Sequence, residues 1–218
     1  MGRGFDRLAT FYAIIETLAF GSLLQKSRCE FLDLVSSGQS ILILGDGDGR
    51  FVQELLQQKT NLHIRLVDFS RSMLEETRKK TVKWAAMNGH AVEFEHADIL
   101  EIAPYPPGAF DLVCSHFFLD CFNEETIQRL ADHILQALKA EGMWMITDFD
   151  MPKKGWKALR ARLWISIMYL FFGIVTGLKT KDLPDYRPIL RQKGMIMQIQ
   201  KARCFSMIRS ECWIRKRS

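Results

Sequence analysis

The 218-residue sequence lacks paired cysteines and lacks an N-terminal apolar core followed by a small-residue cleavage site. Its five cysteines are odd in number and scattered, without a C-x-x-C pair. That pattern argues against a disulfide framework and against a cysteine-rich zinc site. The N-terminus argues against a secretion signal. We therefore expect reduced thiols, no bound metal and a cytoplasmic protein.

A membrane-spanning apolar run is also missing. The longest candidate, residues 163–178, follows a basic stem at 153–162 and is shorter than the roughly 20 residues that a spanning helix needs. Two interpretations stay open. The segment is a buried or lid helix, or it is an interfacial helix whose basic stem contacts lipid headgroups. The second interpretation predicts peripheral membrane contact through residues 153–178.

Charge is close to balanced, with 30 Lys+Arg against 25 Asp+Glu and a net charge of +5. The basic excess gathers at 153–162 and 187–217. These segments lack the interleaved aromatics of a strand-binding groove, which argues against a nucleic-acid partner. With 48% hydrophobic residues, the chain is large enough for one substantial core, so we expect a single domain of unknown oligomeric state.

What the sequence does contain is a glycine-rich turn at residues 40–51, Ser-Ile-Leu-Ile-Leu-Gly-Asp-Gly-Asp-Gly-Arg-Phe. Four apolar residues run into three glycines spaced two apart, and helical spacing follows at once. This order predicts the strand, turn and helix with which parallel sheets bind nucleotides. Glycine suits the turn because it permits positive φ and lets a ligand approach bare backbone.

Strands and helices then alternate along the chain. Alternation predicts right-handed crossovers and a mostly parallel sheet covered on both faces. We predict an α/β, Rossmann-like three-layer sandwich with a seven-stranded sheet that ends in an antiparallel hairpin. Expected strands are 41–44, 62–67, 92–95, 110–115, 143–147, 196–203 and 207–214; expected helices are 51–58, 71–88, 124–140 and 184–192, after helical spacing at 5–36.

The single domain is expected to have four parts. They are an N-terminal helical cap (1–39), a cofactor-binding core (40–150), a helical substrate or lid region (151–194) and the closing hairpin (195–218). In such sheets ligands lie beyond the carboxyl ends of the strands. The residues that follow each strand are therefore the functional candidates.

Two acids follow neighbouring strands. Asp68 ends the second strand, where a carboxylate can accept hydrogen bonds from both hydroxyls of a ribose. Its alternative role is to cap the helix that begins near Arg71, for which Ser70 is the better candidate. Asp98 follows the third strand and can accept from an adenine amino group, with Ile99 against the ring.

As an ordered set, these motifs resemble those of class I S-adenosylmethionine-dependent methyltransferases. The set comprises the Leu-Gly-Asp-Gly-Asp-Gly turn, 67–70 followed by Met73-Leu74, 96–99, and 110–115 before an aromatic stretch. Residues 5–12 resemble the start of ubiquinone/menaquinone C-methyltransferases, and the resemblance covers roughly residues 5–150. It implies S-adenosylmethionine as cofactor. Carried over by position, it implies cofactor contacts at Gly45, Asp46, Gly47, Asp48, Gly49, Asp68, Phe69, Asp98, Ile99 and Ser115.

One position departs from the family pattern. Members usually carry an acid two residues before the first glycine, and here that residue is Ile43. Asp46 or Asp48 is expected to take over part of its work. The turn also resembles that of aminopropyltransferases, which use the decarboxylated cofactor, although the sequence has no Asp-x-x-Asp-Pro stretch. A cofactor-binding protein without turnover is the other alternative.

Methyl transfer needs alignment of the acceptor and, where its nucleophile bears a proton, a base. His116, Asp120 and Asp148 follow strands four and five and are the candidates. His116 is equally compatible with a structural role, and Asp120 with the entrance to the next helix. Tyr12, Phe117 and Trp164 are the substrate-contact candidates. Their aromatic character favours a small, apolar or aromatic acceptor, such as a quinone-like, phenolic, polyketide or lipid molecule.

Overall fold

The computed structural model describes residues 22–150, 183–204 and 206–215. Tyr12, Trp164 and the segment 153–178 lie outside these residues, so the expected lid or membrane contact stays a prediction. None of the helices that the structure describes is long and apolar enough to span a bilayer.

The strands are β1 (Ser40–Leu44), β2 (His63–Asp68), β3 (Ala91–His96), β4 (Phe110–His116), β5 (Leu138–Phe149), β6 (Met195–Arg203) and β7 (Ile208–Arg215). The helices are α2 (Leu23–Arg28), α3 (Arg50–Gln58), α4 (Arg71–Met87), α5 (Glu124–Ala137) and α7 (Tyr186–Gln192), with 3-10 turns η1 (Leu32–Leu34) and η2 (Leu119–Cys121).

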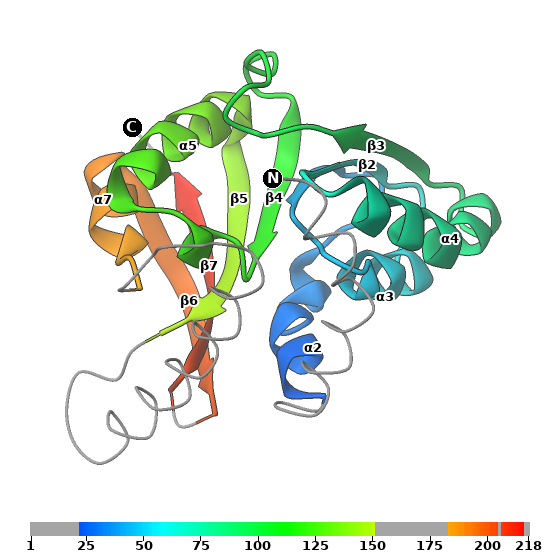
Figure 1. Ribbon diagram of the computed structural model, residues 1–218, viewed down its shortest axis with the longest axis horizontal. Helices are drawn as coiled ribbons and strands as arrows, with labels where there is room; N and C mark the ends of the chain where they lie inside the picture. The colour runs from blue at the N-terminus through cyan, green and yellow to red at the C-terminus, as the bar shows by residue number, and fades with distance from the viewer. Residues whose placement is uncertain (1–21, 151–182, 205, 216–218) are drawn as a thin grey trace.

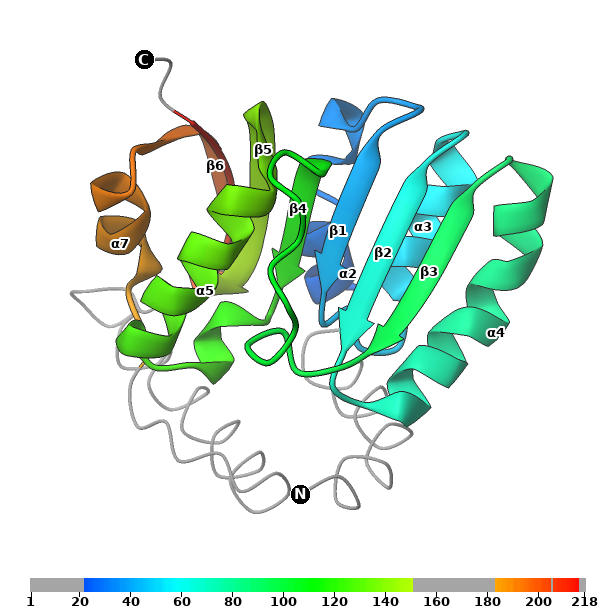
Figure 2. The same ribbon diagram turned by 90° about the horizontal axis from the view of Figure 1, so that it is seen from above.

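The seven strands form one sheet in the order β3-β2-β1-β4-β5-β7-β6 (Figure 1). Neighbours from β3 to β5 run parallel, whereas β7 is antiparallel to both β5 and β6. Helices cover both faces, with α5 and α7 on one and α3 on the other (Figure 2). The predicted Rossmann-like architecture with its antiparallel hairpin is confirmed.

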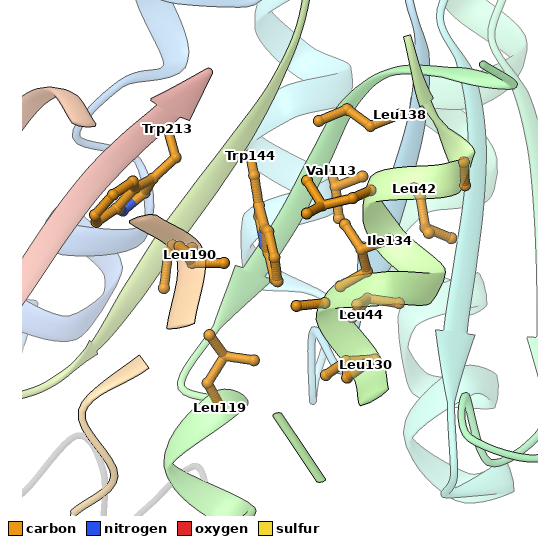
Figure 3. Packing of buried hydrophobic residues seen from close by; sticks show 14 of the residues in the cluster. Leu42, Leu44, Val113, Leu119, Leu130, Ile134, Leu138, Trp144, Leu190 and Trp213 are labelled. Carbon is orange, nitrogen blue, oxygen red and sulfur yellow. The ribbon is translucent and has the colours of Figure 1, made fainter. Parts of the chain in front are cut away.

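The central strand β1 contributes to both cores. Ile41 and Ile43 pack into the cluster under α3 and α4, whereas Leu42 and Leu44 pack into the cluster under α5 and α7. This alternation follows from the two-residue repeat of a strand, and burial on both faces explains why the run is wholly apolar. On the α5 face, the wholly buried Trp144 and Trp213 come from paired positions of β5 and β7 (Figure 3).

The prediction of a helix over 124–140 is wrong at its end. Helix α5 stops at Ala137, and β5 begins at Leu138, which is buried and pairs with Phe110 of β4. Pairing with the sheet therefore overrides helical propensity in the last three residues. Gly142, just beyond the expected helix, lies inside β5, where a Cβ would stand 2.6 Å from the Leu138 side chain.

The N-terminal caps of α4 and α5 bear on the alternative roles considered for Asp68 and Asp120. The Ser70 hydroxyl accepts from the Met73 N–H at 3.4 Å, so Ser70 caps α4 as expected. The Asn123 side chain caps α5 by accepting from the Thr126 N–H at 2.8 Å. Asp120 lies in η2, at the entrance to that helix, but it is not the residue that caps it.

Candidate functional site

The glycine turn joins β1 to α3 with three residues in the left-handed region. Gly45, Gly47 and Gly49 have φ of +62°, +64° and +80°. A Cβ on Gly45 would stand 2.6 Å from the Phe118 ring, and one on Gly49 would stand 2.6 Å from the Thr77 side chain. Above Gly47, however, no atom of the described residues lies within 4 Å of the Cβ position. The turn is closely packed at both ends and open in the middle, where a ligand can approach the backbone.

Asp46 is a buried carboxyl group in the open half of this turn, with 5% of the residue exposed. Its Oδ2 accepts from the Val52 N–H at 3.1 Å, while Oδ1 has no hydrogen-bond partner among the described residues. Burial raises the pKa of Asp46 to about 7, against the lowering effects of the Val52 N–H and of the Arg28 charge. Asp46 therefore presents an unused acceptor inside the site.

Asp48 has the opposite surroundings. Its carboxylate accepts from Lys80 Nζ at 2.9 Å and from Arg50 Nε at 3.0 Å, and Lys80 also donates to the Asp48 carbonyl at 2.7 Å. Burial acts to raise its pKa, but these hydrogen bonds hold the pKa below its usual value. The structure thus places Asp48 against α4, where it fastens the turn.

Asp68 connects the end of β2 to the glycine turn. Its Oδ1 accepts from the Ser70 N–H at 2.8 Å, and its carboxylate also accepts from the Gly47 N–H. Burial raises its pKa to about 6 against these bonds. The side chain of Phe69 follows it at the surface and is 49% exposed. The turn and the acid that were expected to form two walls of one site are therefore in contact.

The loop after β3 supplies the third wall. The Ala97 N–H donates to the Asp68 carbonyl at 3.2 Å, and Asp98 Oδ1 accepts from the Leu100 N–H at 2.9 Å. Ile99 is 7% exposed and packs in the core cluster that includes Leu44. The carboxyl ends of β1, β2 and β3 thus meet at one edge, as the strand order requires.

Ser115 and His116 end β4 and point to opposite faces of the sheet. Ser115 is wholly buried, and its hydroxyl accepts from the Trp144 indole N–H at 3.0 Å, so its side chain belongs to the core. His116 packs edge-on against Phe51 with ring centroids 4.5 Å apart, and neither ring nitrogen has a hydrogen-bond partner within the described part of the chain. Burial lowers its pKa to about 3, which makes it a weak base.

Two carboxyl groups lie near the ends of β4 and β5: Asp120 in η2, beyond β4, and Asp148 among the last residues of β5, which runs past the expected end at 147. Asp148, 2% exposed, accepts from the Phe118 N–H at 3.1 Å and from the next two backbone N–H groups, so it fixes the start of η2. Burial and then the Asp120 charge hold the pKa of Asp148 well above its usual range. Burial raises the pKa of Asp120 to about 6. The charge of each carboxyl group is therefore sensitive to burial, and Asp120 titrates nearer to neutral pH than an ordinary carboxyl group does.

Phenylalanine rings pack in pairs near the ends of β4 and β5. The Phe117 and Phe149 centroids lie 4.9 Å apart, and those of Phe118 and Phe122 lie 5.1 Å apart. Phe117 has φ of +53°, a strained conformation for a residue with a side chain, and its N–H donates to the Thr147 carbonyl at 2.6 Å. This half of the site is apolar, whereas the half near the glycine turn is polar.

Sequence reasoning missed Arg28, the last residue of α2. Arg28 is 7% exposed, and its guanidinium carbon lies 5.0 Å from the Phe117 ring centroid. Helical spacing at 23–35 identified the apolar positions but gave no reason to bury a cation. Only the packing of α2 against the sheet reveals that this basic residue faces the site.

Comparison with known protein families finds one model that matches part of this chain. Residues 41–142 match the family model described as a methyltransferase domain. None of the curated protein sequences compared with this chain matches it. The matched residues include the glycine turn and the strand ends that carry Asp68 and Asp98.

Solved structures share the fold. One is the Burkholderia thailandensis 1,6-didemethyltoxoflavin-N1-methyltransferase, with bound 1,6-didemethyltoxoflavin and S-adenosylhomocysteine; its identity is 12% and its TM-score 0.64, over 89% of this chain and 78% of that one. A SAM-dependent methyltransferase from Aquifex aeolicus has 15% identity and a TM-score of 0.58, over 92% and 96%. The pyocyanin biosynthetic protein PhzM has 13% identity and a TM-score of 0.67, over 90% of this chain and only 56% of its own length. At such identities the likeness establishes the fold.

Proposed function

We propose that this chain, which belongs to the class I S-adenosylmethionine-dependent methyltransferases, methylates a small, apolar or aromatic acceptor whose nucleophile carries a proton. When bound, the cofactor supplies an activated methyl group together with its leaving group. The protein must then bind both molecules, align them and receive the proton. The observation that carries the proposal is the change from a polar, glycine-lined half to an aromatic, carboxyl-lined half along one sheet edge.

The residues of the polar half fit the cofactor. The open space above Gly47 admits a ligand to the backbone, and the unused Oδ1 of Asp46 can accept from an ammonium group. Asp68 is held by N–H donors at the end of β2, where it would receive ribose hydroxyls. Asp98 and Ile99 would contact the adenine. By contrast, Asp48 and the Ser115 side chain support the site from behind.

The aromatic half supports the class of acceptor. Phe117, Phe118, Phe122 and Phe149 are all partly exposed, so they can contact an apolar molecule in addition to each other. No Lys or Arg side chain forms an ion pair with Asp120 or Asp148 in the described ranges. A flat, weakly polar acceptor with one hydroxyl or amine suits this combination.

Asp120 is the proposed proton acceptor. Its pKa of about 6 keeps it ionised at neutral pH while leaving it a better base than an ordinary carboxylate. Asp148 is a positioning residue, because its carboxylate holds the backbone of residues 118–120. The buried His116, with its pKa of about 3, is the poorer candidate.

Isothermal titration with S-adenosylhomocysteine tests the cofactor half. We expect binding by the wild type and about a 10- to 100-fold loss in Asp68→Ala, because hydrogen bonds to a charged group are removed. Glu75→Ala is the matched control, since Glu75 is an exposed carboxylate on the neighbouring α4. Folded wild type that did not bind at millimolar ligand would contradict the proposed function.

The acceptor half is tested by release of S-adenosylhomocysteine from S-adenosylmethionine in the presence of simple phenols, quinols and aromatic amines. With an active acceptor, kcat should rise as the pH increases through about 6, and Asp120→Asn should lower kcat and abolish that rise while leaving cofactor affinity unchanged. Turnover confined to polar or macromolecular acceptors would contradict the acceptor class. Cofactor binding without any turnover would favour a binding protein.

A further inference from the structure

The connection between β3 and β4 differs from the other parallel crossovers of the sheet. Helices α3, α4 and α5 lie in the other three, whereas residues 97–109, all of which the structure describes, contain no helix. This β3–β4 loop runs along the α5 face of the sheet (Figure 2). A crossover usually contains a helix, whose internal hydrogen bonds keep its shape. Because the loop carries Asp98 and Ile99, other contacts must fix the third wall of the site.

The middle of the β3–β4 loop lies over a small cavity. Ile99, Ile102 and Pro104 line it from the loop, and Leu42 and Ile134 line it from β1 and α5. Side chains that border empty space lose the contacts that would otherwise hold them in place. Packing against the sheet and α5 is therefore not sufficient to define where this part of the loop lies.

Tyr105 attaches the loop to the sheet through its side chain. The prolines at 104, 106 and 107 have no backbone N–H to donate, so this stretch has few backbone hydrogen bonds to offer. Tyr105 is 8% exposed, and its hydroxyl donates to Glu95 Oε2 at 3.0 Å. Its ring packs edge-on against Phe110, with centroids 5.3 Å apart. A buried hydrogen bond to a carboxylate is a strong attachment for a loop of this kind.

Arg65 of β2 completes this attachment. Its guanidinium carbon lies 5.4 Å from the Tyr105 ring centroid, and it forms ion pairs with Glu93 and Glu95 of β3. Burial, and then the Glu95 charge, hold the pKa of Tyr105 above its usual value, so the hydroxyl keeps its proton and can donate. The Tyr105 side chain thus fastens the loop to β2 and β3 together.

We infer that Tyr105 is a positioning residue that sets the base selectivity of the site, because it holds the β3–β4 loop where Asp98 can accept from the amino group of adenine. The inference rests on the proposed function. Tyr105 acts through the loop, since its own hydroxyl is engaged by Glu95. Within the loop, Asp98 Oδ1 accepts from the Leu100 N–H at 2.9 Å, so the orientation of its carboxylate follows the backbone.

Base selectivity is a sensitive measure of where the Asp98 carboxylate lies. Adenine presents an amino group at its 6-position, whereas hypoxanthine presents an oxygen, which a carboxylate cannot accept a hydrogen bond from. A site built to bond a ligand's N–H rejects the analogue that lacks it, provided that the acceptor is held in place. A loop that could shift into the cavity would discriminate less.

The wild type provides the first test, by isothermal titration with S-adenosylhomocysteine and S-inosylhomocysteine. We expect the adenine ligand to bind about 10- to 100-fold more tightly, as one hydrogen bond to a charged group requires. Asp98→Asn should reduce or reverse this preference, because its amide can donate to the hypoxanthine oxygen. Equal affinities in the wild type would overturn the inference and leave cofactor binding intact. If neither ligand bound, the proposed function itself would fail.

Tyr105→Phe tests the positioning role, because it keeps the ring and removes only the hydroxyl. We expect the affinity for S-adenosylhomocysteine to fall by about 3- to 10-fold while that for S-inosylhomocysteine changes little, so the preference narrows by the same factor. Tyr186→Phe is the matched control. Tyr186 is also buried and donates to a carboxylate, Glu211 Oε2 at 3.2 Å, but it belongs to α7. Its loss should leave the base preference unchanged.

Glu95→Leu tests whether Tyr105 acts through its carboxylate partner. This variant should narrow the base preference as Tyr105→Phe does. The double variant should narrow it no further, because both changes remove the same hydrogen bond. Effects that added in full would show that the two residues act separately and would overturn the proposed attachment. Circular dichroism melting establishes that each variant is folded.

Two further outcomes would overturn the role of Tyr105. One is a Tyr105→Phe variant with the base preference of the wild type. The other is a folded variant in which both affinities fall by the same factor, since this would give Tyr105 a purely structural role. In either case, binding of S-adenosylhomocysteine by the wild type would still support the proposed function.

Discussion

The two halves of the glycine turn use the same residue types for different purposes. Asp46 and Gly47 form an open half: among the described residues, one buried oxygen of Asp46 has no partner and no atom lies within 4 Å of the Cβ position of Gly47. Asp48 and Gly49 form a fastened half, in which two cations hold the carboxylate and Thr77 closes on the glycine. The difference shows that the repeated Asp-Gly pairs do not have equal surroundings: the side chain of the second acid is held by cations, whereas that of the first leaves one buried oxygen without a partner among the described residues.

The largest effect is expected from alanine at the two glycines. Gly49→Ala should lower the free energy of unfolding by about 3 to 5 kcal/mol, because the left-handed backbone is strained and the new Cβ overlaps Thr77. Gly47→Ala should cost only about 1 kcal/mol, from the backbone alone, yet should weaken S-adenosylhomocysteine binding more than tenfold. Urea unfolding and titration measure both. Equal stability losses would contradict the division of the turn.

An intermediate effect is expected from removing charge in each half. The folded state raises the pKa of Asp46, so ionisation costs stability as the pH rises from about 4 to about 7. Asp46→Asn should therefore match the wild type near pH 4 and exceed its stability by about 4 kcal/mol at pH 8. Asp48 has a lowered pKa, so Asp48→Asn should be destabilising at pH 8, with the loss fading as the pH falls through the usual carboxyl range.

Chemical unfolding at several pH values, with ligand absent, measures these differences. An Asp46→Asn variant that was less stable than the wild type at pH 8 would show that the buried carboxylate is stabilised by partners, contrary to the open-half description.

The smallest effect on stability is expected from Lys80, the α4 residue that donates to the Asp48 carboxylate. Lys80→Met keeps the length of the side chain and removes the cation that joins α4 to Asp48, which should cost about 1 kcal/mol because the pair is partly exposed. The loss should shrink at high salt. Lys79→Met is the control, since its side chain lies at the surface of the same helix. A loss of stability that did not depend on salt would instead indicate that the aliphatic part of the Lys80 side chain stabilises the protein by packing.

Local patterns predicted most of the polar half. The apolar run of β1 and the glycines after it define the turn, and the rule that ligands lie beyond strand ends selects Asp68 and Asp98. Their meeting at one edge follows from the parallel strand order. None of these inferences needs to know which distant segments touch.

Long-range contacts account for what the sequence did not predict. Whether Asp46 or Asp48 is free depends on Lys80, more than thirty positions along the chain, and the burial of Arg28 depends on hydroxyls in β5 and β7. The boundary between α5 and β5 likewise depends on Leu138 pairing with Phe110. Spacing within one segment carries no information about such partners.

The attachment of α2 has a consequence for the order in which the protein matures. Arg28 belongs to the first described helix, but the Ser210 hydroxyl that helps hold that helix belongs to the last strand. During synthesis the glycine turn emerges early, whereas one of the bonds that place Arg28 beside it forms only after β7 has left the ribosome. A chain cut short before β7 would therefore have the glycine turn without this anchor of α2.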